Sequence, residues 1–140
     1  MKHHLMGNIN TISRCATLYR DAQLEGKGLT GWQAPYLPEI CGSPGITQDQ
    51  LALRLHVNRS NVTRQLTMLE ENGYVLRRRS ESDRRTVEVY PTEKAQQMLP
   101  VVQEAFRSWR EKLFRGLGGE EREQLEELLE RLARRAEEIE

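Results

Sequence analysis

The chain has 140 residues, of which 30% are charged and 6% aromatic, and its 21 basic and 21 acidic side chains give a formal net charge of +0. This length favours one domain over two independent ones, and the composition is typical of helix-rich soluble proteins. No apolar stretch approaches the roughly 20 residues of a membrane span, and the N-terminus shows no secretory signal, so we expect a cytoplasmic protein with no membrane partner. Because the total charge is neutral, a nucleic-acid surface would require local clustering of arginine.

Two helices are predicted in the first third of the chain. Ile9 and Ile12 begin an apolar series at spacings of three to five residues, which predicts the first helix. Thr30 is the predicted N-cap of a second, short helix, on which Trp32 and Tyr36 face inward. A turn rich in glycine, with one proline, ends this helix.

Two further helices joined by a tight turn follow. Thr47 and Gln50 predict a capping box at the start of the first, Asn58 or Ser60 can cap the second, and Gly73 ends it. Such a pair can lay its second helix in the major groove of DNA. The polar, basic side of this helix carries residue types that can bond to base edges and phosphates, and the predicted reading residues are Arg59, Ser60, Asn61, Thr63 and Arg64. The alternative is a capped helix with a solvated outer face.

A β-hairpin is predicted over residues 74–90, because two strand-like runs flank a polar turn. The hairpin concentrates arginine, whereas the last helix of the chain is rich in glutamate, so a neutral chain has a positive and a negative pole. The predicted DNA-binding residues of this wing are Arg77, Arg79, Asp83, Arg84 and Arg85.

Two long helices complete the chain. Thr92 is the predicted N-cap of the first, and Pro100 predicts a kink in it. The last helix has one leucine-rich stripe surrounded by Glu and Arg. This stripe must be covered, either by a second chain or within an intramolecular helical hairpin.

The sequence resembles the MarR family of winged helix-turn-helix transcriptional regulators from Ile9 to its end. The most specific match is SDRRTVEVYPTEKA at residues 82–95, which is similar to the family's wing signature of Asp-x-Arg, a strand and a Thr-Glu-Lys helix start. Supporting matches are GLT at 28–30, GITQ at 45–48 and NVTR at 61–64.

The resemblance implies a mainly α-helical fold with a small β-hairpin wing. In one MarR-type domain over 1–140, residues 30–91 would form the winged helix-turn-helix DNA-binding lobe, and residues 1–29 and 92–140 the helical dimerisation region. The implied function is that of a sequence-specific regulator that binds double-stranded DNA and represses transcription until a small ligand releases it. Arg85 would enter the minor groove and Asp83 would orient it, although the same pair can also rigidify the turn.

The resemblance also implies partners. A homodimer would place two recognition helices about one DNA turn apart, which predicts a pseudo-palindromic operator. The residues expected at the dimer interface are Ile9, Ile12, Leu125, Leu128, Leu129 and Leu132. A crevice for a small aromatic effector would be lined by Trp32, Tyr36, Phe106 and Trp109, although aromatic residues at helical spacing are more often core.

A thiol-based redox regulator is an alternative, because Cys15 and Tyr19 match peroxide-sensing members of the family. However, the segment from Cys15 to Thr30 is shorter than in those sensors, and Gly31 stands where they carry tyrosine. We therefore predict half-buried, unreactive thiols for Cys15 and Cys41.

Two other classes of function remain to be considered. A winged-helix module that binds an acidic protein or only scaffolds a dimer is an alternative, which the salt dependence of DNA binding would distinguish. An enzyme is not predicted, because His3, His4 and His56 have no Cys or carboxylate partners at ligand spacing and no phosphate loop or nucleophile motif is present. No catalytic residue, metal or cofactor is expected.

Overall fold

The computed structural model describes residues 4–139, so the ends of the predicted domain at 1–3 and 140 lie outside the described residues. The chain forms two compact units, Met1–Trp109 and Arg110–Glu140. Its elements in chain order are α1 (Leu5–Gln23), α2 (Tyr36–Gly42), β1 (Ile46–Thr47), α3 (Gln48–Leu55), α4 (Arg59–Glu71), β2 (Val75–Arg79), β3 (Val87–Pro91), α5 (Glu93–Leu113) and α6 (Gly119–Glu138). The predicted class, mainly α-helical with a small β-hairpin wing, is confirmed.

The helix-turn-helix begins and ends where the sequence predicts. The Thr47 hydroxyl accepts from the Gln50 N–H at 3.1 Å, and Gln50 Oε1 accepts from the Thr47 N–H at 3.0 Å, which is the predicted capping box of α3. His56 ends α3 in the left-handed conformation with φ of 55°. Asn58 then caps α4 by accepting from the Asn61 N–H at 2.7 Å, and Gly73, with φ of 80°, follows the end of α4.

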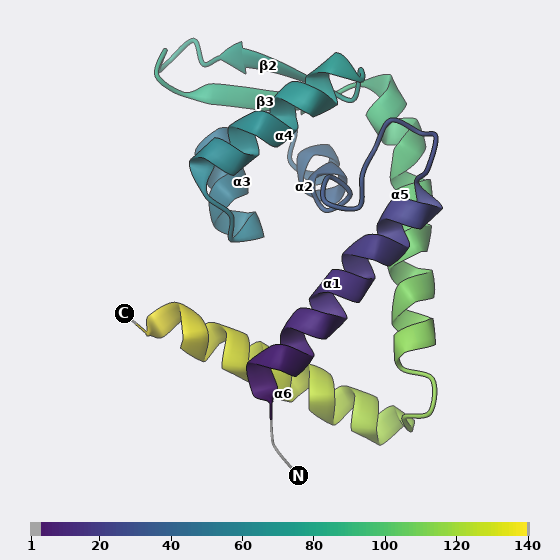
Figure 1. Cartoon of the computed structure of the whole chain (residues 1–140). Coiled ribbons are helices and arrows are strands. Elements are labelled where there is room, and N and C mark those ends of the chain that lie inside the picture. The colour runs from purple at the N-terminus through teal and green to yellow at the C-terminus, as the bar shows by residue number, and fades with distance from the viewer. Residues whose placement is uncertain (1–3, 140) are drawn as a thin grey trace. The chain divides into compact units, whose positions relative to one another are not determined.

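A three-stranded antiparallel sheet replaces the predicted two-stranded hairpin. Its order is β1-β3-β2, so the two-residue strand β1 pairs with β3 through Ile46↔Val89 and Thr47↔Glu88. On the other side of β3, Val89 pairs with Arg77. Strand β1 thereby ties the start of α3 to the wing. Figure 1 shows the turn of the β2–β3 hairpin at the same end as the start of α4.

The core of the first unit joins the helix-turn-helix to the sheet. Its fully buried side chains come from α2, α3, α4, β2, β3 and α5, and they include Leu37, Ile40, Leu51, Leu66, Leu69, Val75, Val89 and Val102. Because these side chains pack from several elements at once, α4 is held rigidly with its polar side outward.

The short second helix begins later than predicted. Thr30, the predicted N-cap, exchanges two hydrogen bonds with Gln33: its N–H donates to Gln33 Oε1 at 3.0 Å, and its hydroxyl accepts from the Gln33 N–H at 3.2 Å. However, Pro35 has no N–H to bond to the Gly31 carbonyl, so α2 starts only at Tyr36. The predicted inward position of Trp32 is wrong, because this side chain lies in the turn before α2 and is 69% exposed.

Gly31 makes a close backbone contact with α1 that the sequence did not reveal. Its N–H donates to Asp21 Oδ1 at 3.0 Å, and its carbonyl accepts from Arg20 Nε at 3.2 Å. A Cβ atom at this position would lie 2.1 Å from the Thr17 carbonyl oxygen. The approach therefore requires a residue without a side chain.

The two cysteines differ in their surroundings. Cys15 is exposed, so its predicted half-buried position is wrong: Ala16 and Thr17 take the buried face of α1 and leave Cys15 outside. Cys41 is half-buried, and burial raises the pKa of its thiol.

The second unit contains the end of α5, a turn and α6. The Glu121 carboxylate accepts from the Gly118 N–H at 2.9 Å at the start of α6, and the Arg110 guanidinium binds Glu126. The apolar stripe of α6 is exposed in the protomer and comprises Leu125, Leu128, Leu129 and Leu132. Within residues 4–139, no helix has the length and apolar character needed to cross a membrane.

Candidate nucleic-acid interface

The first two turns of α4 present the predicted reading residues on the surface. Arg59, Ser60, Thr63 and Arg64 are exposed, and Asn61 is half-buried. Their backbone is fixed because Val62 and Leu66, on the opposite side of the helix, are fully buried. The helix thus offers a rigid row of donors and acceptors of the kind that reads base edges.

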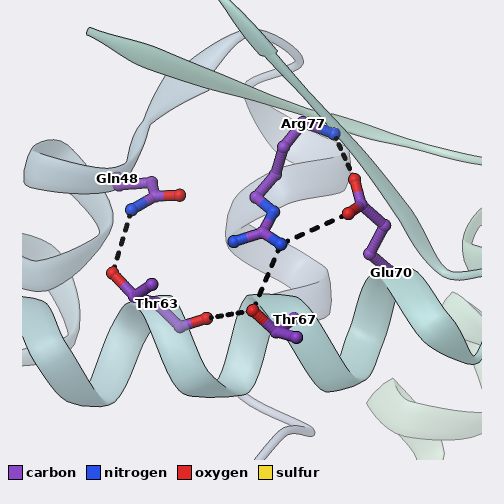
Figure 2. Close-up of polar contacts among 5 residues, drawn as sticks. All are labelled: Gln48, Thr63, Thr67, Glu70 and Arg77. Carbon is purple, nitrogen blue, oxygen red and sulfur yellow. Dashed lines mark hydrogen bonds and ion pairs between the residues drawn. The ribbon is translucent and has the colours of Figure 1, made fainter. Parts of the chain in front are cut away.

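Polar contacts from α3 hold two of these residues. Gln48 Nε2 donates to Thr63 Oγ1 at 3.2 Å (Figure 2). The Thr63 hydroxyl in turn donates to the Arg59 carbonyl at 3.0 Å. Asp49 Oδ1 lies 2.7 Å from Arg59 Nε. The first turn of α3 therefore braces the first turns of α4.

The base of the wing is joined to α4 by one arginine. Glu70 accepts from the Arg77 backbone N–H at 2.9 Å and from Arg77 Nη2 at 3.2 Å, and Nη2 also donates to Thr67 Oγ1 at 3.1 Å (Figure 2). The backbone N–H of Arg77, together with its guanidinium, lowers the pKa of the Glu70 carboxyl against the opposing effect of burial. The Arg77 side chain, 20% exposed, is thus directed at α4.

The wing turn is organised by Asp83. Its carboxylate accepts from the Arg85 N–H at 3.1 Å and from the Thr86 hydroxyl at 3.2 Å, and it lies 3.5 Å from Arg85 Nε. Arg79 Nη1 donates to the Arg84 carbonyl at 2.9 Å, which closes the turn from the other strand. The Arg85 side chain is 94% exposed. The tip is a fixed turn that carries a freely accessible cation.

A small hollow of about 120 Å³ brings the two predicted sets of residues together. It lies between the start of α3, the start of α4 and the wing turn, and its lining includes Asp49, Arg59, Thr63 and Arg85. Arg59 and Arg85, which are 26 positions apart in the sequence, therefore belong to one surface. Two arginines, a threonine hydroxyl and the start of a helix suit a phosphate backbone.

The four aromatic residues of the predicted crevice differ in exposure: Trp32 is exposed, Tyr36 is buried, and Phe106 and Trp109 are half-buried. Phe106 lies under the Arg20 guanidinium, 5.0 Å from ring centroid to Cζ, and the Trp109 ring lies 5.5 Å from the ring of Tyr19. Tyr36 is buried, its hydroxyl has no partner among the described residues, and burial raises the pKa of that hydroxyl.

Comparison with known proteins identifies this arrangement. Residues 33–87 match the model of the MarR family. The uncharacterized HTH-type transcriptional regulator YybA of Bacillus subtilis strain 168 is 27% identical over 95% of this chain and 89% of YybA. The crystal structure of MarR is 30% identical, with a TM-score of 0.87 over 96% of this chain and 92% of that chain. The chain belongs to the MarR family.

Membership of the MarR family makes the protein a DNA-binding transcriptional regulator and not an enzyme. The family fold is also that of MepR from S. aureus, solved in complex with DNA, which is 21% identical with a TM-score of 0.87 over 96% of this chain and 99% of MepR. Within residues 4–139, no group of three His, Cys, Asp or Glu side chains is placed to hold a metal ion.

Four residues that brace this MarR-family interface are absent from the sequence-based prediction, namely Gln48, Asp49, Thr67 and Glu70. An acidic residue in the first turn of α3 would ordinarily be assigned to the helix dipole. The contacts of Gln48, Asp49 and Glu70 instead join separate elements, so helical or strand periodicity carries no signal for them.

Proposed function

We propose that this regulator recognises a specific duplex sequence by placing the start of α4 in a major groove and the wing turn in the adjacent minor groove. The observation that carries this proposal is the single surface formed by Arg59, Thr63 and Arg85. Arg59 and Arg64 can bond to guanine, Asn61 to adenine, and exposed Arg85 suits a narrow minor groove. MepR, which shares the fold, was solved in complex with DNA, and this supports DNA binding by a protein of this fold.

The proposed roles of the wing residues differ. Arg84 and Arg85 would contact DNA, Arg79 and Asp83 would shape the turn, and Arg77 would position the wing relative to α4. The contacts of Arg77 with Glu70 and of Arg79 with the Arg84 carbonyl support this division.

A selection from random duplexes, followed by gel-shift titration at fixed salt, tests the proposal. Loss of a base contact in Arg64→Ala should raise the Kd by about 5- to 150-fold and relax preference at one position, because such contacts contribute about 1–3 kcal/mol. Arg85→Ala should weaken binding with an unchanged melting temperature, since its side chain packs on little. Arg115→Ala, in the turn before α6, is the control. Equal affinities for all three variants and wild type would refute the assignment.

We further propose a homodimer built by residues 1–29 and 92–140, with residues 30–91 as the DNA-binding lobe. The exposed stripe of α6 and exposed Ile12 of α1 support it, because apolar surface of this extent needs a cover. Leu128→Glu should yield monomers in light scattering, whereas Leu53→Glu, at an even more exposed leucine on α3 (76% against 52%), should not. A monomeric wild type at micromolar concentration would refute the dimer. A dimer also implies a pseudo-palindromic operator.

Repression relieved by a small effector completes the proposal. A hollow of about 510 Å³ supports an effector site, and it is lined by α1, the α1–α2 turn and α4, including Leu18, Gln33 and Met68. Gln33 Nε2 is buried there without a partner among the described residues. A small aromatic molecule with a hydrogen-bond acceptor would satisfy this donor. The protein should silence a reporter gene placed behind the selected operator, and activation of that gene would refute repression. If no small aromatic acceptor in a panel released the protein from the operator, the effector would be refuted.

A further inference from the structure

Arg59 occupies an unusual place for a cation. It is the first residue of α4, where the partial positive charge of the helix end disfavours a guanidinium. Its side chain is 79% exposed and packs on little. A long exposed side chain of this kind loses considerable rotamer freedom when a base fixes it, which weakens binding to every sequence.

Asp49 offsets both disadvantages. Its Oδ1 lies 2.7 Å from Arg59 Nε, and it stands on the first turn of α3. The capping box formed by Thr47 and Gln50 fixes that turn, and the bond from Gln48 to Thr63 fixes α3 against α4. The carboxylate is therefore held by a rigid support at the point where it meets the guanidinium.

The side of the guanidinium that Asp49 engages decides what remains for DNA. A carboxylate at Nε occupies the Nε side of the guanidinium and leaves the Nη1–Nη2 edge, which can bond to guanine O6 and N7 together. We propose that Asp49 is a positioning residue that orients Arg59 for guanine and thereby sets the sequence specificity of this regulator. The inference rests on the proposed reading of DNA by α4.

The charge of Asp49 gives this role a distinctive signature. The hollow that contains Asp49 also contains Arg59 and Arg85, which are both proposed to contact DNA. A carboxylate in that place repels phosphates, so it lowers affinity for duplexes of every sequence. Its removal should therefore strengthen non-specific binding and weaken discrimination. If Asp49 only supported the first turn of α3, its removal would leave the preference for guanine unchanged.

The closing experiment compares wild type and Asp49→Asn on three duplexes: the selected site, the same site with the guanine assigned to Arg59 replaced, and an unrelated sequence. We expect the preference for guanine to fall by about two- to fivefold, the range for exposed ion pairs, and affinity for the unrelated duplex to rise. In the Arg59→Ala background, Asp49→Asn should leave the preference unchanged. Glu39→Gln, which removes the exposed pair of Glu39 with Arg54 at 3.3 Å, is the matched control.

The outcomes separate the two proposals. Wild type without preference among the three duplexes would remove the proposed reading of DNA and this inference with it. A selective wild type and an equally selective Asp49→Asn would overturn only the role of Asp49. A lowered melting temperature with unchanged preference would likewise overturn it, because it would assign Asp49 to the stability of α3.

Discussion

Replacing Glu70 by alanine tests whether the wing is held to α4 through its base. The change removes the acceptor of two bonds from Arg77, one from the backbone N–H at 2.9 Å and one from Nη2 at 3.2 Å. Hydrogen bonds to charged groups contribute about 1.5–3 kcal/mol, but the Glu70 side chain is 38% exposed and solvent screening reduces this value. The bond from Arg77 to Thr67 remains. We therefore expect a loss of about 1–2 kcal/mol in the free energy of unfolding.

Urea unfolding at pH 7 and one protein concentration measures this loss as a lower midpoint with an unchanged slope. The matched variant is Glu71→Ala, because Glu71 is the next residue of α4 and is exposed. It should shift the midpoint little. If Glu70→Ala and Glu71→Ala had the same midpoint, the contact between wing and helix would contribute nothing, and the reasoning would be wrong.

Three other measurements follow from the contacts described above. Gly31→Ala should lower the free energy of unfolding by about 2–4 kcal/mol, because the new Cβ would lie 2.1 Å from a backbone oxygen of α1. Gly42→Ala is the control, since a Cβ at that position meets open space, and it should leave the melting temperature nearly unchanged. The pKa of the Glu70 carboxyl is lowered in the folded state, so the ionised carboxylate stabilises the fold at pH values above its ordinary pKa, and this stabilisation is lost as the pH falls through the lowered pKa. In Glu70→Gln, the free energy of unfolding should therefore decrease less steeply with falling pH. In a Cys15→Ser variant, Cys41 should react with a disulfide reagent more slowly than after unfolding in urea, because burial shields its thiol and raises its pKa.

Local chemistry made the helix-turn-helix predictable. The capping box of Thr47 and Gln50, the cap at Asn58 and the left-handed Gly73 are each fixed by neighbours within a few residues, so the sequence reveals them directly. The family resemblance rests on the same segments, together with the wing turn around Asp83. The exposed face of α4 follows from its periodicity, because Val62 and Leu66 must turn inward.

Contacts between segments that are distant in the sequence could not be predicted from it. The pairing of β1 with β3 depends on Ile46 meeting Val89, and the late start of α2 depends on Pro35 and on the Gly31 carbonyl turning to Arg20. The direction of the Arg77 side chain is another case, since an arginine on a strand has no local reason to face Glu70.

Sequence by itself therefore determined the order of the helices and the wing hairpin, the caps of α3 and α4, the family and the polar face of α4. Only the tertiary structure decided that the Arg85 side chain is exposed, that Glu70 holds Arg77, and that Arg79 bonds to the Arg84 carbonyl. The physical reason is range: a cap or an apolar period is satisfied within a few residues of its own position, whereas an ion pair such as Asp49 with Arg59 forms only after packing has brought two elements together.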